Sequence, residues 1–138
     1  MAYDNTVPDP DNPGLEDLDA MRENFQLLED SQVVDEGSTE DGHYIRYENG
    51  WQMCISPVLS FDITNEFGAI YQSDTEERVD WNLPIDFISD GFRHISEAYG
   101  SNCWSSSYVV NGEIRIVGYS GTSRTDDDVG AIAIGRWK

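Results

Sequence analysis

The sequence predicts a mainly β protein: an antiparallel β-sandwich knob preceded by an extended arm and one α-helix. Seven or eight short, strand-like segments joined by turns are typical of a sandwich. Asn49-Gly50 and Asn111-Gly112 each separate two such segments, and Asn-Gly is a strong signal for a tight β-hairpin. A helical period occurs over residues 13–31, and a chain of 138 residues fits one domain of ordinary size.

The first 14 residues predict an extended arm without a core of its own. They contain Pro8, Pro10 and Pro13, which disfavour regular structure. Asp9 and Asp11 do not have the spacing of a calcium-binding loop, so we expect no metal site there.

Residues 13–31 predict the helix. Asn12 can cap it, and Pro13 suits its first turn. Its apolar residues follow the 3-4-3 spacing of a coiled-coil seam for about two heptads. These seam residues are Leu18, Met21, Phe25 and Leu28. Two interpretations remain open: the seam packs on the sheet of its own chain, or helices from several copies bundle as a short stem.

Polar, turn-rich residues 35–42 predict a hinge between an arm-and-helix segment (1–42) and the sandwich (43–138). After residue 42 the period changes to two. Asp126-Asp127-Asp128 predicts a turn before the last strand. The expected strands lie at 44–48, 51–61 with Pro57 at an edge or bulge, 69–71, 79–83, 92–98, 103–110, 113–119 and 129–138.

The strand predicted over residues 129–138 ends the sequence without a polar tail. Free termini usually fray unless something holds them. We therefore expect this strand to be paired in a sheet or buried against another copy of the chain, with Trp137 as a docking residue.

The charge is strongly acidic, with a formal net charge of −19. Residues 1–42 hold 13 acids and one base, and residues 43–138 hold 14 acids and seven bases. Such a balance argues against nucleic acid and anionic membrane surfaces as partners, since phosphate binding needs clustered Lys and Arg. The sequence has neither a membrane-spanning run nor a signal-peptide pattern, so we expect synthesis in a cytosol.

Catalysis is not predicted, because no recognised catalytic or nucleotide-binding motif is present. His94 lies near Ser96 and Glu97, yet His43 and His94 are each more simply structural or surface residues. Cys54 and Cys103 are far apart and have no metal-ligand spacing, so we expect free thiols. We also expect no metal and no cofactor.

The best candidate for ligand binding is the stretch with Trp104, Ser106 and Tyr108. Aromatic faces stack on sugar rings and small hydroxyls bond to saccharides. The alternative is that Trp104 fills the sandwich core, and Trp51, Trp81 and Trp137 are expected in the core or an interface.

Three segments also carry a family resemblance. Trp81-Asn-Leu-Pro-Ile-Asp-Phe87 has a W-x-φ-P-φ-x-F pattern (φ apolar), 44–54 holds an Asn-Gly hairpin, and 132–138 is an abrupt last strand. Together with the helix over 15–28, they resemble the β-sandwich knobs that end bacteriophage tail fibres, which are related in style to H-type lectins. That family's ligand residues vary too much to transfer to this chain.

The resemblance implies a homotrimeric appendage of a virion, made in the host cytoplasm. Residues 1–42 would dock to other virion proteins, and the knob would bind host surface glycan without inserting into a membrane. One alternative is a capsid or tail decoration protein with no receptor role. A second is a small glycan-degrading enzyme using acids around Glu76, Glu77 and Asp80.

Overall fold

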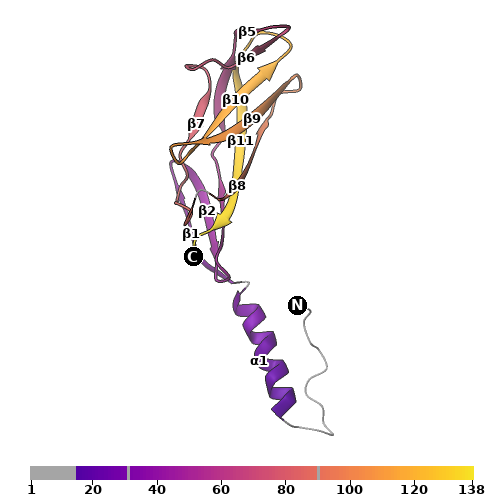
Figure 1. The fold of residues 1–138 in the computed structure, drawn as a ribbon, viewed down its shortest axis with the longest axis vertical. Helices are drawn as coiled ribbons and strands as arrows, with labels where there is room; N and C mark the ends of the chain where they lie inside the picture. The colour runs from indigo at the N-terminus through magenta and orange to yellow at the C-terminus, as the bar shows by residue number, and fades with distance from the viewer. Residues whose placement is uncertain (1–14, 31, 90) are drawn as a thin grey trace.

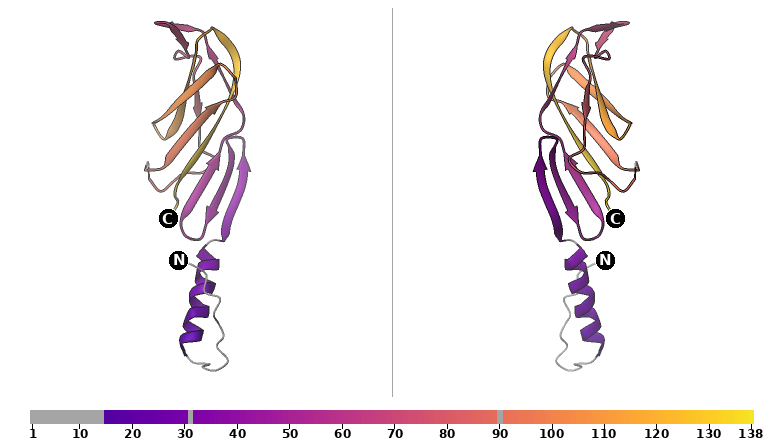
Figure 2. Two further views of the ribbon diagram at one scale, coloured as in Figure 1. Left: turned by 90° about the vertical axis from the view of Figure 1, so that its right-hand side faces the viewer. Right: turned by 90° about the vertical axis from the view of Figure 1, so that its left-hand side faces the viewer.

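The computed structural model of the chain describes residues 15–30, 32–89 and 91–138, with the side chains of 15–18 and 28–30 left out. The predicted arm over residues 1–14 lies outside the described residues. Two antiparallel sheets form an elongated sandwich, and the single described helix projects from one end (Figures 1 and 2). This architecture confirms the predicted fold class.

The elements have the following order and bounds. They are α1 (Leu15–Asp30), β1 (Val33–Thr39), β2 (Gly42–Tyr47), β3 (Trp51–Ile55), β4 (Leu59–Ile63), β5 (Asn65–Phe67), β6 (Ile70–Gln72), β7 (Val79–Trp81), β8 (Arg93–Ala98), β9 (Cys103–Val110), β10 (Glu113–Ser120) and β11 (Arg124–Arg136).

Each sheet is organised around one long strand. Sheet A has the order β1-β2-β3-β11-β4, with β8 also paired to β11. Sheet B has the order β5-β6-β10-β7, with β9 also paired to β10. Along one edge β11 pairs with β3 and then β4, and along its other edge it pairs with β8.

The segment predicted as one strand over 51–61 forms β3 and β4 on the same edge of β11. Pro57 interrupts them, as expected of a residue without an N–H group. Ser56 bridges the interruption: its N–H donates to Ala131 O at 2.9 Å, and its Oγ accepts from Ala131 N–H at 2.8 Å. The strand direction therefore continues through a local break in the ladder.

The core lies between the two sheets. Its largest fully buried side chains include Trp81, Ile63, Ile114 and Ile116. The indole Nε1 of Trp81 donates to Asp41 O at 2.7 Å, so the one polar atom of this ring is satisfied. No buried side-chain nitrogen or oxygen atom among the described residues lacks a hydrogen-bond partner.

Both predicted Asn-Gly hairpins are confirmed. Asn111 and Gly112 have φ angles of 51° and 81° between β9 and β10, as a two-residue type I′ turn requires. Gly50, at φ 91°, closes the turn between β2 and β3.

The predicted hinge over residues 35–42 is wrong. Residues 33–39 form β1, which pairs with β2 and makes sheet A begin before residue 43. Polar composition misled the prediction because β1 is an edge strand whose side chains are mostly exposed. Such positions tolerate Asp, Glu and Ser.

The predicted turn at Asp126-Asp127-Asp128 is also wrong, since these residues lie inside β11. Asp126 has a φ angle of 55°, where the pairing with β4 shifts register, so the triplet marks a bulge. Asp is among the few residues that tolerate this conformation. Arg124 holds the bulge through two hydrogen bonds to Asp127, at 2.7 and 2.8 Å.

The predicted helix is confirmed over Leu15–Asp30, but it does not pack on the sheets of its own chain (Figure 2). Of the predicted seam, Met21 is 38% exposed and Phe25 is 60% exposed. The side chains of Leu18 and Leu28 lie outside the described part. The interpretation in which the seam covers the sheet is therefore wrong for its described residues.

Candidate binding face

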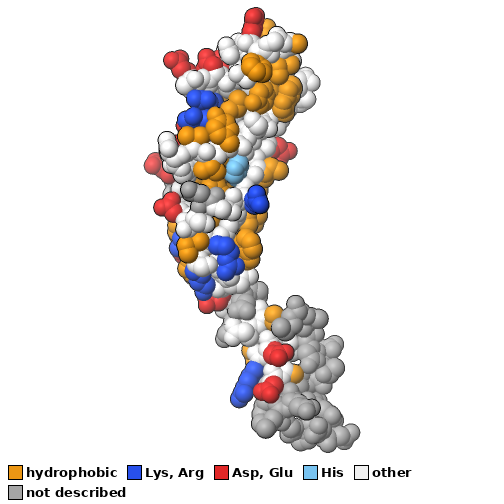
Figure 3. Space-filling view, in the orientation of Figure 1, with side chains coloured by type: hydrophobic (Ala, Val, Ile, Leu, Met, Phe, Trp, Pro, Cys, Tyr) orange, Lys and Arg blue, Asp and Glu red, His pale blue; other side chains and the backbone are white. Residues whose placement is uncertain are grey.

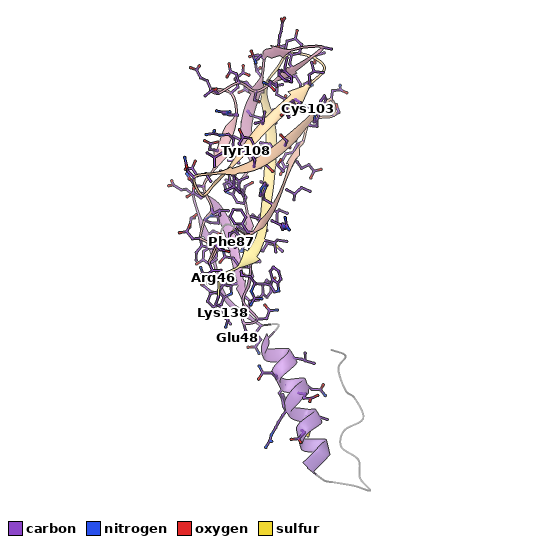
Figure 4. The ribbon with its side chains drawn as sticks, in the orientation of Figure 1. Arg46, Glu48, Phe87, Cys103, Tyr108 and Lys138 are labelled. Atoms are coloured by element: carbon purple, nitrogen blue, oxygen red, sulfur yellow. The ribbon has the colours of Figure 1, made fainter. Side chains whose placement is uncertain are left out.

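Strand β9 presents Trp104, Ser106 and Tyr108 on one face, because side chains alternate along a strand. Trp104 is 49% exposed and Tyr108 is 43% exposed, so Trp104 does not fill the core. The side chains at the alternate positions of β9, which include Cys103 and Ser105, point toward sheet A. In Figure 4, the labelled Cys103 and Tyr108 mark the course of β9.

The Asn111-Gly112 turn sets which β10 residues join this face. It pairs Trp104 with Tyr119 and Tyr108 with Arg115. The rings of Trp104 and Tyr119 stack with centroids 6.0 Å apart and an interplanar angle of 15°. The Ser106 Oγ donates to the Tyr119 hydroxyl at 3.4 Å. The result is an aromatic platform edged by hydroxyl groups, and Figure 3 shows hydrophobic side chains gathered over this upper part of the molecule.

A charged pair extends the same face. Arg115 donates from Nε and from one terminal nitrogen to the two Asp80 carboxylate oxygens, at 2.6 and 2.7 Å. Hydrogen bonding from Arg115 lowers the pKa of Asp80 despite partial desolvation. The same bond, with a smaller contribution from Tyr108, raises the pKa of Arg115. The face thus carries fixed donors and acceptors with little net charge.

An open hollow adjoins the platform at the end of β9. It measures about 490 Å³ and is lined by Ser101, Asn102, Cys103, Trp104, Gly121 and Thr122. Its polar lining groups are hydroxyl and amide side chains, and the indole of Trp104 forms one wall. Such a combination suits a polyhydroxylated ring, which has apolar C–H faces and polar edges.

Sequence reasoning identified Trp104, Ser106 and Tyr108 but did not place Tyr119, Arg115 or Asp80 on this face, since it named Asp80 only as an acid of the enzyme alternative. The sequence did contain a signal for Tyr119 and Arg115, because a two-residue turn at 111–112 determines which β10 residues lie opposite Trp104 and Tyr108. Asp80 carried no comparable signal, since β7 has only three residues and is separated from β10 by a long stretch of chain.

Trp137, predicted as a docking residue, makes contacts within its own chain. Its Nε1 donates to Tyr47 O at 2.9 Å, and its ring lies 5.0 Å from the charged groups of both Arg46 and Lys138. Arg46, Glu48 and Lys138 lie at the end of the sandwich next to α1 (Figure 4). A docking role for Trp137 stays a prediction.

The two histidines are separate from each other and from the binding face. His94 Nδ1 lies 2.9 Å from Ser107 Oγ rather than beside Ser96, and burial lowers its pKa. His43 Nδ1 lies 2.8 Å from Ser38 Oγ. The Nε2 of His43 also lies 3.8 Å from a Glu36 carboxylate oxygen, so His43 lies between a serine and an acid on the β1–β2 edge of sheet A. The predicted contact between His94 and Ser96 does not form, because Ser96 Oγ lies 2.9 Å from Ser105 Oγ.

Two of the three acids considered for a glycosidase, Glu77 and Asp80, use their carboxylates to hold other groups of the fold, and Glu76 contributes a bond from its backbone N–H. The Glu77 carboxylate accepts from the N–H of Thr64 and of Asp74, and from the Thr64 hydroxyl. The Glu76 N–H donates to Asp74 Oδ1 at 2.8 Å, and Asp80 is held by Arg115. These contacts organise the segment that leads into β7.

Cys54 and Cys103 are free thiols, as the sequence predicts. Burial raises the pKa of the Cys54 thiol, which suits a packed core residue. The described residues contain no group of three or more His, Cys, Asp or Glu side chains placed to hold a metal ion. In the same part of the chain, no helix combines the length and apolar character needed to cross a bilayer.

Comparisons of the chain with protein-family models, with curated proteins and with solved structures find no match.

Proposed function

We propose that this protein is a non-catalytic binding knob whose β9–β10 face recognises host surface glycan. The observation that carries the proposal is the exposed Trp104 ring stacked on the partly buried Tyr119 ring, flanked by hydroxyls. Half-exposed aromatic rings on a regular sheet are costly to leave in water, and they match the C–H face of a pyranose.

The charge of the face favours a neutral saccharide over an acidic one as the ligand. Arg115 is already paired with Asp80 and is not free to bind a carboxylate or sulfate. The chain as a whole carries a net charge of −19 and repels polyanions. Neutral hexose chains avoid that repulsion and can use the hydroxyl groups around the platform.

The carrier of the knob is proposed to be a bacteriophage particle, on which the chain is a homotrimeric tail-fibre, spike or head-fibre appendage. Support comes from the resemblance of Trp81–Phe87 and from the helix, which extends away from the sandwich as a stem would (Figure 1). Residues 1–42 would contact other virion proteins, although β1 within them belongs to sheet A. Several weak sites on one particle would raise avidity without any new contact.

A glycan array probed with the intact protein tests the proposal. We expect binding to neutral host glycans and a loss of about tenfold in affinity for Trp104→Ala, which corresponds to about 1.4 kcal/mol. A monovalent oligosaccharide titrated by calorimetry measures the single site. The matched control is Phe67→Ala, since Phe67 is 57% exposed but lies on β5, outside β9 and β10. Absence of binding to glycans and host cells would favour the decoration role, and equal effects of both variants would remove β9 as the site.

A further inference from the structure

The outward-facing side chains of Trp104, Ser106 and Tyr108, here called the β9 row, include two separate aromatic rings. Trp104 and Tyr108 lie four residues apart on the same face of the strand, which corresponds to about 13 Å between their Cα atoms. Each ring is nearly half exposed. A pyranose is a six-membered ring about as wide as the ring of Tyr108, so one sugar unit cannot stack on both. The proposed binding face therefore has room for more than one unit.

The residues between the two rings are small. Ser106 lies between them on β9, and register places Val117 opposite Ser106 on β10. Val117 is 8% exposed, so its side chain does not project above the face. Ser106 donates to the Tyr119 hydroxyl and keeps its oxygen lone pairs for a sugar hydroxyl. A sugar chain that passes from one ring to the other therefore crosses Ser106 and Val117 and meets a hydroxyl group on its way.

The open hollow continues the same line beyond Trp104. Its volume of about 490 Å³ lies within the range of small-molecule sites. The side chains of Ser101, Asn102 and Thr122 line it, and they hydrogen-bond no group in the part of the chain that the structure describes. Their hydroxyl and amide groups can therefore bond to a sugar unit. The hollow thus extends the β9 row by one further position for a ligand.

A second line of side chains starts at the same platform and crosses the strands. Register leads from Tyr119 to Gln72 on β6 and then to Asn65 on β5. Phe67 lies two residues further along β5 on the same face, at the end of the sandwich that is far from α1 (Figure 1). The line along β9 is the one that leads into the hollow, and for that reason it is favoured as the course of a sugar chain.

The apolar outer face of sheet A offers a different surface. It exposes the aliphatic side chains of Ile95, Ile132 and Ile134, which have no flat ring to stack on a sugar. Trp51 adds a ring there, and the guanidinium group of Arg136 lies 5.4 Å from its centre. The alternation of free rings with hydroxyl groups therefore distinguishes the β9 row from this face.

We infer that the ligand of the β9–β10 face is a linear neutral oligosaccharide that lies along β9 and spans at least three sugar units. One unit stacks on Tyr108, one stacks on the platform of Trp104 and Tyr119, and one enters the hollow. The inference deepens the proposed function and rests on it. A short glycan end would use the platform alone, whereas a repeating chain buries more surface with each position that it fills, so affinity rises with length until the row is full.

Calorimetric titration of the full chain with linear neutral saccharides tests the inference. The probes are maltose and maltohexaose, mannobiose and mannohexaose, and the disaccharide and hexasaccharide of any other neutral glycan that the array identifies. We expect the natural chain to bind a hexasaccharide at least about tenfold more tightly than its disaccharide. Tyr108→Ala should lose most of this preference and keep its affinity for the disaccharide within about threefold. Tyr108→Phe should retain the preference, because the ring remains.

Phe67→Ala is the matched control, because it removes a ring that is 57% exposed from the line that crosses the strands. It should retain the preference for the hexasaccharide. A long chain also has more ways to place one unit on a single ring, so the test compares the preference between variants rather than between ligands alone. If Tyr108→Ala does not fold by circular dichroism, Tyr108→Thr replaces it, since threonine suits a strand.

Three results would overturn the inference and leave the proposed function standing. The natural chain could bind the disaccharide as tightly as the hexasaccharide, the preference could survive in Tyr108→Ala, or Phe67→Ala could abolish the preference, which would mean that the sugar chain crosses the strands. Absence of binding to every saccharide of the series and of the array would overturn both proposals.

Discussion

Gly118 is the position at which the structure makes the sharpest stability prediction. It lies in β10 and faces sheet A, where a Cβ atom would come 2.8 Å from Phe61 Cζ and 2.9 Å from Ile63 Cδ1, and would overlap Phe61 Cε2. Carbon atoms pack at about 3.5–4.0 Å, so Gly118→Ala forces the Phe61 ring to retreat by at least about 0.7 Å. Phe61 is 2% exposed and belongs to the buried core cluster, so its ring cannot retreat without moving core neighbours.

Overpacking of this kind costs about 1–3 kcal/mol, while replacing glycine with alanine regains about 0.4–1 kcal/mol by restricting the unfolded chain. We therefore expect Gly118→Ala to lower the free energy of unfolding by about 1–2 kcal/mol in urea denaturation. Gly121→Ala is the matched control, because a Cβ atom at Gly121 meets nothing within 4 Å. It should be neutral or slightly stabilising.

A double-mutant cycle identifies the cause. Phe61→Leu removes the clashing ring atoms, so its cost should be smaller in the Gly118→Ala background than in the natural chain, with a coupling of at least about 0.5 kcal/mol. If Gly118→Ala proves as stable as Gly121→Ala, or the two substitutions add without coupling, then the two sheets do not pack here as described.

Further predictions concern the charged pair, a turn and the helix. Hydrogen bonding from Arg115 lowers the pKa of Asp80, so the pair stabilises the fold above the ordinary aspartate pKa, and this contribution is lost as pH falls through the lowered pKa. Asp80→Asn should therefore reduce the loss of stability on acidification, measured as the free energy of unfolding against pH. An unchanged loss of stability at acid pH would contradict this. Gly112→Ala, at φ 81°, should destabilise the β9–β10 hairpin by about 1 kcal/mol in thermal unfolding, and no loss would argue against the type I′ turn. Phe25→Asp should weaken assembly or docking in light scattering while circular dichroism retains the sheet signal; loss of that signal would mean that the helix is part of the core.

Strand periodicity and turn chemistry made most of the fold predictable. The Asn111-Gly112 turn specifies its own geometry, so the sequence also contained the pairing of Trp104 with Tyr119. The hinge over 35–42 could not be distinguished from an exposed edge strand, because both are polar. The bulge at Asp126 depends on a local contact between Arg124 and Asp127 and on a long-range contact from Asp62, and the second leaves no local signal.

The candidate site was predictable only in part, because the sequence does not show which face of a strand is exposed. Alternation on β9 identified three side chains on one face, but only the fold shows which face is exposed. The apolar outer face of sheet A was missed because Ile132 and Ile134 alternate with Ala131 and Ala133, and all four read as one apolar run. A run of this kind does not reveal whether a sheet is covered by its own chain or by another.

The position of β11 bears on how the chain folds as it is made. This strand joins β3, β4 and β8, all of which precede it in the sequence. Until residues 124–136 have left the ribosome, those three strands lack the strand that pairs with all of them. Their apolar side chains therefore remain exposed to water. Sheet A is therefore completed only after its last strand has been synthesised. Its folding depends on pairing between strands that are far apart in the sequence, and such pairing is expected to be slow in β proteins.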